Sequence, residues 1–147
     1  MNPDDIKYHR EHAWVRAEGK RATIGITDYA QQQMGDIVYI DLPDVDTEID
    51  ADSELSEVES TKATSPVVSP VSGIVAEVNE DLTDSPEIIN EDPYGNGWLV
   101  VLEMSDPSEL NDLMNKSEDE KFLKEEQRRF EILDAHWDVP LNEVDLK

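Results

Sequence analysis

The chain has 147 residues, enough for one domain with a modest core and too few for two ordinary domains. Its 12 basic and 36 acidic residues give a formal net charge of −24, which repels nucleic-acid phosphates and anionic membrane surfaces, so neither partner is expected. The absence of cysteine excludes disulfides, thiolate nucleophiles and cysteine-based zinc or iron–sulfur sites.

No targeting segment is expected at the N-terminus. Residues 1–5 are acidic and no apolar run follows them, which argues against a signal peptide. No stretch approaches the roughly 20 apolar residues that a membrane-spanning helix needs. We therefore expect a soluble, cytoplasmic protein.

The first predicted elements are a hairpin and a short helix. Residues 13–17 and 22–26 predict two strands, joined by a turn at residues 18–20. Thr27 is placed to cap a helix over residues 28–34. Gly35 would end this helix, because glycine tolerates the left-handed conformation that closes helices.

The remaining strands follow at short intervals and complete a mainly β domain. They are predicted over residues 37–40, 53–58, 64–68, 73–78 and 98–102. A weak repeat of glycine followed by apolar β residues, at 35–38 and 73–75, suggests two similar units folded against each other. We expect residues 1–104 to form a small all-β sandwich or barrel.

The C-terminal third changes from strand patterns to helix patterns. We expect helices over residues 105–135, packed on or beside the β domain, with Pro107 near the first helix start. Residues 117–120 fit a capping box for a second helix, which Val139-Pro140 would end. Residues 136–147 are expected to be a loose or partner-docking tail of what is a single domain overall.

Lys62 is the candidate functional residue. It lies among small polar residues between the strands predicted over 53–58 and 64–68, at the expected tip of a tight hairpin. A hairpin tip gives an amine both exposure and a fixed backbone, which a covalent attachment site needs. The alternative is an ordinary solvated lysine, but the scarcity of lysine in this chain favours an attachment site.

The other polar residues predict neither a catalytic nor a metal site. His9 and His12 are three residues apart, but no third ligand stands at a metal-site spacing, which favours surface or half-buried imidazoles. The glycine-rich segment 92–98 lacks the lysine of a phosphate loop, and the many carboxylates form pairs by chance. Glu11 and His12 are candidates for lining a groove that receives a carried group. We expect a carrier and not an enzyme.

Several motifs in order resemble the H protein of the glycine cleavage system, over roughly residues 6–125. They are Tyr8, His12 and Trp14-Val15; residues 22–31; residues 34–38; Leu42-Pro43; residues 58–65; residues 69–73; residues 77–79; residues 90–94; and Gly97-Trp98.

This resemblance implies a lipoyl-type barrel-sandwich hybrid with C-terminal helices, and lipoic acid in amide linkage on Lys62. Biotin carriers share the fold, but their lysine usually lies between two methionines, whereas Thr61 and Ala63 flank Lys62. It also implies a non-catalytic carrier, whose lipoyl-lysine swinging arm shuttles an intermediate between enzymes. The motif around the attachment lysine consists of Glu59, Ser60, Thr61, Ala63, Thr64 and Ser65.

Two positions depart from the glycine-cleavage pattern. In those H proteins the residue before Trp14 is normally Glu and the one after Ser65 is normally Asp, where this chain has Ala13 and Pro66. The two acids help to hold a cationic, aminomethyl-loaded arm through charge-assisted hydrogen bonds. Ala13 and Pro66 cannot do so, and the neighbouring Glu11 is a partial substitute. The chain also resembles H-like lipoate-binding proteins of a sulfur-oxidising heterodisulfide-reductase-like system, which would need no such clamp.

The preferred hypothesis is therefore a carrier of a sulfur intermediate. The alternative is a glycine cleavage H protein that carries the aminomethyl group during glycine decarboxylation. A lipoate ligase or transferase would load Lys62, and the other partners would be the heterodisulfide-reductase-like complex or the glycine cleavage decarboxylase, aminomethyltransferase and dihydrolipoamide dehydrogenase. A third hypothesis is an acidic interaction protein whose lysine stays unmodified.

Overall fold

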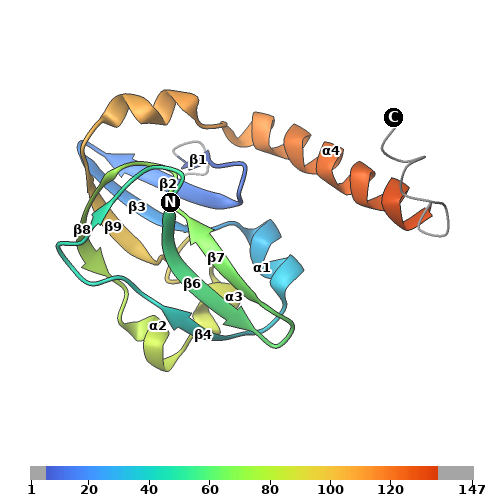
Figure 1. Ribbon diagram of the computed structural model, residues 1–147, viewed down its shortest axis with the longest axis horizontal. Helices are drawn as coiled ribbons and strands as arrows, with labels where there is room; N and C mark the ends of the chain where they lie inside the picture. Colours follow the sequence, from blue (N-terminus) through green and yellow to red (C-terminus); the bar gives the residue numbers. More distant parts are fainter. Residues whose placement is uncertain (1–5, 136–147) are drawn as a thin grey trace. The chain divides into compact units, whose positions relative to one another are not determined.

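The computed structural model describes residues 6–135 (Figure 1). It divides into a β-rich unit that extends to Lys116 and a C-terminal unit that begins at Ser117. The domain boundaries at residues 104 and 135 that the sequence suggests stay predictions. In the described part of the chain, no helix is long and apolar enough to cross a membrane.

Two antiparallel sheets form the β-rich unit. Sheet A has the strand order β1-β2-β3-β9-β8-β5, and sheet B has the order β4-β6-β7. The strands are β1 (Ile6–Tyr8), β2 (Ala13–Glu18), β3 (Arg21–Ile26), β4 (Ile37–Asp41), β5 (Glu48–Ile49), β6 (Glu54–Ser60), β7 (Thr64–Val68), β8 (Gly73–Val78) and β9 (Val100–Met104).

Short helices connect the strands. They are α1 (Asp28–Met34), α2 (Asp81–Asp84), α3 (Ile88–Glu91) and the 3₁₀ helix η2 (Pro107–Asp112), followed by α4 (Lys116–Ala135). The prediction for α1 is confirmed residue by residue. Thr27 accepts a hydrogen bond from the Ala30 amide at 3.1 Å, and Gly35 closes the helix with φ +79°.

The main core lies between the two sheets, where alternate residues of each strand point inward. Sheet A contributes Val15, Ile24 and Leu102, and sheet B contributes Ile40 and Val58, all nearly inaccessible to solvent. The predicted mainly β sandwich is therefore confirmed. The separation of inward apolar and outward polar residues along each strand is what made it predictable.

A second, smaller cluster forms around the indole of Trp14. Trp14 is fully buried with Ile6 and Tyr8, and half-buried Tyr94 and Trp98 pack against it. Its Nε1 donates to the Pro93 carbonyl at 2.9 Å, which satisfies the one polar atom of the ring. The rings of the 92–98 segment therefore pack against Trp14.

Trp14 also explains a glycine in the facing strand. Gly25 pairs with Trp14 across β2 and β3. A Cβ atom on Gly25 would lie 2.7 Å from the indole, closer than real carbon contacts allow. The strand keeps a glycine here because the ring occupies the space of a side chain.

The last strand begins later than the sequence predicts. The prediction placed its start at Trp98, but β9 begins at Val100. The side-chain amide of Asn79 donates to the carbonyls of Asn96 and Trp98, each at 2.8 Å. These carbonyls are therefore engaged by a side chain and not by a neighbouring strand.

The C-terminal elements also differ in detail from the prediction. The helix expected near Pro107 is the short 3₁₀ helix η2, capped by Asp106, whose carboxylate accepts from the Ser108 amide at 3.1 Å. Hydrogen bonds from the Ser108 side chain and amide lower the pKa of Asp106. Helix α4 begins at Lys116, so Ser117 lies inside its first turn and not at the predicted cap. The predicted end at Val139-Pro140 and the tail 136–147 lie outside the described residues.

Candidate functional site

Lys62 lies at the tip of the hairpin formed by β6 and β7, as the sequence predicts (Figure 1). Glu59 pairs with Thr64, and the Ser60 amide donates to the Ala63 carbonyl at 2.8 Å. This pairing leaves Thr61 and Lys62 as the two loop residues, both exposed. Within residues 6–126, no carboxylate forms an ion pair with the Lys62 amine.

The side chain of Ser60 fixes the backbone of this loop. Ser60 is only 6 % exposed, and its hydroxyl donates to the Ala63 carbonyl at 3.1 Å. The same oxygen accepts from the amides of Lys62 and Ala63, each at 3.2 Å. One buried hydroxyl therefore satisfies three loop groups, so the backbone under Lys62 is held while its side chain stays outside.

The residues that follow α1 contact the hairpin tip. The Thr61 amide donates to the Asp36 carbonyl at 3.0 Å. A Cβ atom on Gly35 would lie 3.5 Å from Cε and 3.9 Å from Nζ of Lys62, so the lysine side chain passes over this glycine. The hairpin tip and the end of α1 thus form one surface.

Asn90 on α3 holds the segment that supports the tip. Its Nδ2 donates to the Gly35 carbonyl and to Oε1 of Gln31, and its Oδ1 accepts from the Ile37 amide, all at 2.9 Å. The sequence indicates no role for Asn90, because its partners lie more than 50 positions away. No local sequence signal identifies such contacts.

The predicted groove residues lie beside the other end of α1. The ring of half-buried His12 lies 4.9 Å from that of Tyr29, in the first turn of α1. Glu11 is exposed, and its amide donates to Nδ1 of His9. Lys62 lies beside Gly35 at the C-terminal end of α1, whose seven residues span about 10 Å, and His12 lies beside Tyr29 in its first turn. The structure thus brings His12 and Lys62 to opposite ends of the same helix.

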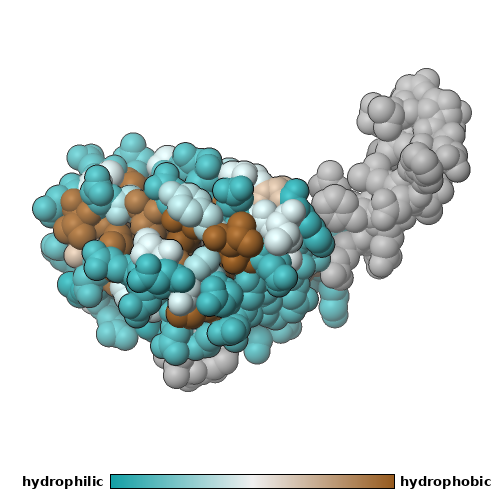
Figure 2. Space-filling model, turned by 90° about the horizontal axis from the view of Figure 1, so that it is seen from below, coloured by the Kyte–Doolittle hydropathy of each residue, from teal (hydrophilic) through white to brown (hydrophobic). Residues whose placement is uncertain are grey.

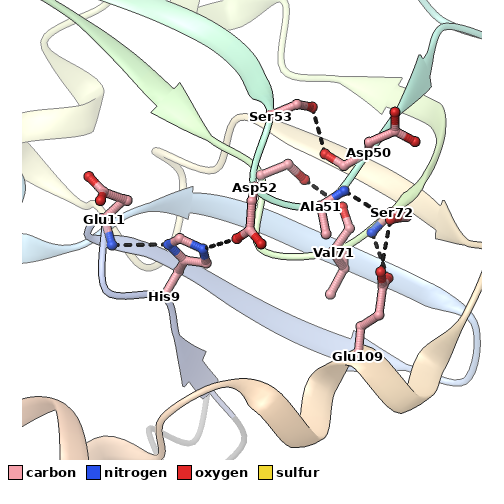
Figure 3. A network of polar contacts seen from close by, with 10 residues as sticks. His9, Glu11, Asp50, Ala51, Asp52, Ser53, Val71, Ser72 and Glu109 are labelled. Atoms are coloured by element: carbon pink, nitrogen blue, oxygen red, sulfur yellow. Dashed lines mark hydrogen bonds and ion pairs between the residues drawn. The ribbon is translucent and has the colours of Figure 1, made fainter.

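A polar network anchors the open end of the lysine hairpin (Figure 3). Buried His9 donates from Nε2 to Oδ1 of Asp52 at 2.6 Å and accepts the Glu11 amide at Nδ1, an arrangement that requires the neutral ring. The Asp52 amide donates to the Ser69 carbonyl at 2.8 Å, which joins the loops at the base of β6 and β7. His9 thus has a structural role and is more buried than the surface or half-buried position expected.

Glu109 closes the other side of this network. Its carboxylate accepts from the amide and the hydroxyl of Ser72 at 2.8 and 2.9 Å (Figure 3). The Ser72 hydroxyl in turn accepts from the Ala51 amide at 2.8 Å. The base of the hairpin is therefore tied to β1 through His9 and to η2 through Glu109.

The two positions that depart from the expected pattern lie in strands. Ala13 is 1 % exposed in β2 and pairs with Ile26. Pro66 is exposed in β7, opposite Glu57. β7 is an edge strand, which tolerates a residue without an amide proton. Neither position offers a carboxylate to a cationic group.

Two hollows of the surface are lined by residues other than Lys62. One of about 390 Å³ is bordered by Asp81, Glu91, Asp92 and Trp98 among others, and one of about 130 Å³ lies between β4 and β6 around Leu42 and Leu55. No group of three or more potential metal ligands occurs among the residues that the structure describes. Lys62 is exposed on the hairpin tip and lines neither of these two hollows.

Comparison with known proteins decides the family. Residues 6–126 match the family described as Glycine cleavage H-protein. The chain belongs to this family. Among its relatives, "Glycine cleavage system H protein 4" of Aquifex aeolicus is 54 % identical over 121 residues, which cover 82 % of this chain and 71 % of the relative.

Other relatives match along almost their whole length. The "Glycine cleavage system H protein" of Carboxydothermus hydrogenoformans is 50 % identical over 84 % of this chain and 95 % of its own length, and that of Bacillus subtilis is 48 % identical over 84 % and 98 %. The crystal structure of a glycine cleavage system H protein from Mycobacterium marinum has a TM-score of 0.74 and 32 % identity, covering 86 % of this chain and 99 % of that one.

Membership in the family confirms three predictions. The fold is a lipoyl-type barrel-sandwich hybrid, the protein is a non-catalytic carrier, and its cofactor is lipoic acid covalently attached to a lysine. The glycine cleavage H-protein family is thereby established, whereas the preferred sulfur-oxidation subtype is not supported by these relatives.

The residues around Lys62 fit this cofactor. An acyl chain in amide linkage needs an exposed amine and neighbours small enough to leave it free. Lys62 is exposed, Thr61 and Ala63 flank it, and Gly35 presents no side chain beneath it.

Proposed function

We propose that Lys62 is the lipoyl attachment residue and that the chain is a carrier for a glycine cleavage system. The observation that carries the proposal is the hairpin tip, where Ser60 and Asp36 fix the backbone and the Lys62 side chain remains exposed. A tethering residue needs this combination, because the tether must move while its anchor stays in place.

The choice of glycine cleavage over sulfur oxidation has its own support. The relatives described above are named glycine cleavage system H protein and match 82–84 % of this chain. The implied partners are a lipoate ligase or transferase, the decarboxylase, the aminomethyltransferase and dihydrolipoamide dehydrogenase. This choice reverses the preference that Ala13 and Pro66 suggested.

The residues of this chain position and confine the carried group. When bound, lipoic acid supplies a dithiolane that accepts and releases the cargo. The lysine stem and lipoyl chain together comprise roughly ten single bonds of about 1.5 Å, a reach on the order of 10 Å. This reach keeps the cargo at high effective concentration near partner active sites.

We also propose that His12 and Glu11 receive the arm between visits to partners. The reach of the arm is similar to the length of α1, at whose far end His12 packs on Tyr29. Exposed Glu11, adjacent to His12, offers a carboxylate to a cationic cargo.

Ala13 and Pro66 favour a second candidate function, a carrier of a sulfur intermediate for a heterodisulfide-reductase-like complex. An uncharged sulfur cargo needs no carboxylates at these two positions. Glu11 is then expected to have no effect on the carrier's turnover.

The proposed function is tested by glycine decarboxylase exchange with the lipoylated chain. We expect saturable exchange with the wild-type chain and none with Lys62→Arg, because arginine cannot form the amide. The matched control is Lys20→Arg, which alters an exposed lysine in the turn between β2 and β3 and should exchange like the wild type. A lipoylated wild-type chain that supports no exchange would favour the sulfur candidate.

A further inference from the structure

Two adjacent apolar side chains of β4 are exposed close to the lysine tip. Val38 is 51 % exposed and Tyr39 is 54 % exposed. Figure 2, which views the molecule from below Figure 1 and therefore from the side of α2 and β4, shows apolar side chains within an otherwise largely hydrophilic surface. We call Val38 and Tyr39 the β4 patch.

A break in the strand register explains why both side chains are exposed. In a regular strand, successive side chains alternate between core and solvent. The pairing of β4 with β6 shifts between Ile37, which faces Ser60, and Tyr39, which faces Glu59. The extra residue, Val38, turns the strand so that two neighbours point outward while Ile37 and Ile40 remain buried. The exposure of the patch is thus built into the backbone.

The β4 patch adjoins the lysine. Tyr39 faces Glu59, so their Cα atoms are about 5 Å apart. Two residues before Val38, the Asp36 carbonyl binds the Thr61 amide next to Lys62. β4 is also an edge strand of its sheet, with α2 in contact with it, and the exposed side chains of Val38 and Tyr39 remain accessible to a partner.

Charged side chains surround the patch. Asp36, Asp41, Glu57 and Glu59 are all exposed on β4, on β6 or just before β4. An apolar centre with an acidic rim fits a partner that has an apolar centre and a basic rim.

We propose that the β4 patch is the docking surface for the enzyme that acylates Lys62. This inference rests on the proposed lipoylation of Lys62. In the acylation, the deprotonated Nζ attacks the carbonyl carbon of an activated lipoyl donor such as an acyl adenylate. The amide C–N bond forms as the bond to the leaving group breaks, the leaving group departs with the electron pair, and the amine proton passes to solvent.

The position of the reacting atom, Nζ of Lys62, favours the acylating enzyme over the other partners as the occupant of the β4 patch. Enzymes that use the loaded arm engage its far end, on the order of 10 Å from the tip. The acylating enzyme must bring its donor to Nζ itself. It therefore contacts the surface next to Lys62, where the β4 patch lies.

The test compares initial rates of lipoylation over a range of carrier concentrations, with a purified bacterial lipoate ligase, ATP and lipoate, read by intact mass. The variant V38T/Y39T removes the apolar surface but keeps β-branched residues suited to a strand. We expect its KM for the carrier to rise about tenfold with kcat nearly unchanged. The lost apolar contact area weakens binding of the carrier to the ligase but does not affect the chemical step.

The matched control is V45T/I74T, which alters two apolar side chains of similar exposure, 50 % and 47 %, away from the hairpin tip. We expect its KM to stay within about twofold of the wild type. Thermal melts of both variants establish that they are folded. The wild-type KM should also rise with added salt, because the acidic rim is screened.

Three results would overturn the docking proposal and leave the proposed function intact. The first is an unchanged KM for V38T/Y39T while Lys62→Arg abolishes lipoylation. The second is an unchanged lipoylation KM with a raised KM for the decarboxylase, which would make that enzyme the occupant. The third is a salt-independent KM. A wild-type chain that gains no lipoyl mass would overturn both proposals.

Discussion

The side chain of Asn90 makes three hydrogen bonds that fix the end of α1 and the start of β4, next to the hairpin tip that carries Lys62. It bonds the Gly35 carbonyl and the Ile37 amide, and the carbonyl of the intervening Asp36 accepts a hydrogen bond from the Thr61 amide. The position of Lys62 thus depends on a residue 28 positions away in sequence. At this scale, the site is a set of long-range hydrogen bonds around one exposed amine.

Asn90→Ala should lower both stability and the rate of lipoylation. The loss leaves partly buried backbone groups without a partner, at a cost of about 1–3 kcal/mol in the free energy of unfolding. Urea unfolding measures the stability, and the initial rate of lipoylation under folding conditions should fall several-fold. Asn96→Ala is the matched control, because Asn96 is exposed and its hydrogen bonds with Asn79 and Asp92 use its backbone. Equal effects of the two substitutions would contradict the role of Asn90.

At the scale of elements, the sequence predicted those whose signals are local. The Thr27 cap, the helix end at Gly35 and the hairpin around residues 18–20 depend on neighbouring residues, and all three appear as expected. The short elements β1, β5, α2 and α3 were missed because two to four residues do not display a periodicity. The start of β9 was misplaced because the Asn79 amide, about 20 positions away, engages the carbonyl of Trp98.

The first turn of α4 contains a carboxyl whose charge is unfavourable. Burial raises the pKa of Asp119 to about 6, and the negative charges of Glu120 and Glu126 add to this effect. Because the pKa is higher in the folded than in the unfolded chain, the folded state binds more protons between about pH 4 and pH 6, and stability falls as pH rises through this range.

Asp119→Asn should therefore stabilise α4 at neutral pH and make its stability less dependent on pH. We expect a gain of roughly 1 kcal/mol, because loss of the favourable helix-dipole interaction offsets part of the relieved penalty. Circular dichroism of helix unfolding at acidic and neutral pH measures the effect. Glu125→Gln, at an exposed position of the same helix, is the control and should leave the pH dependence unchanged. A variant that is less stable than the wild type at neutral pH would contradict the assignment.

For the whole molecule, composition and motif order predicted the fold class and the carrier function, which the family confirms, whereas attachment at Lys62 stays a prediction and the cargo was not decided. Position 66 illustrates the limit. Pro66 departs from the expected acid and suggested a sulfur cargo, yet the relatives that share this chain's sequence are glycine cleavage H proteins. A single residue such as Pro66 can change the affinity for a cargo without changing the surfaces that bind the partner enzymes. The identity of residue 66 therefore could not decide the function.

We propose that this carrier is loaded at one amine, that of Lys62. The most direct test of this proposal is peptide mapping by mass spectrometry of the full chain after lipoylation. We expect one lipoyl group per chain, on the peptide that contains Lys62, and no lipoyl group on the Lys62→Arg variant. A lipoyl group on another lysine, or an unmodified wild-type chain, would contradict it.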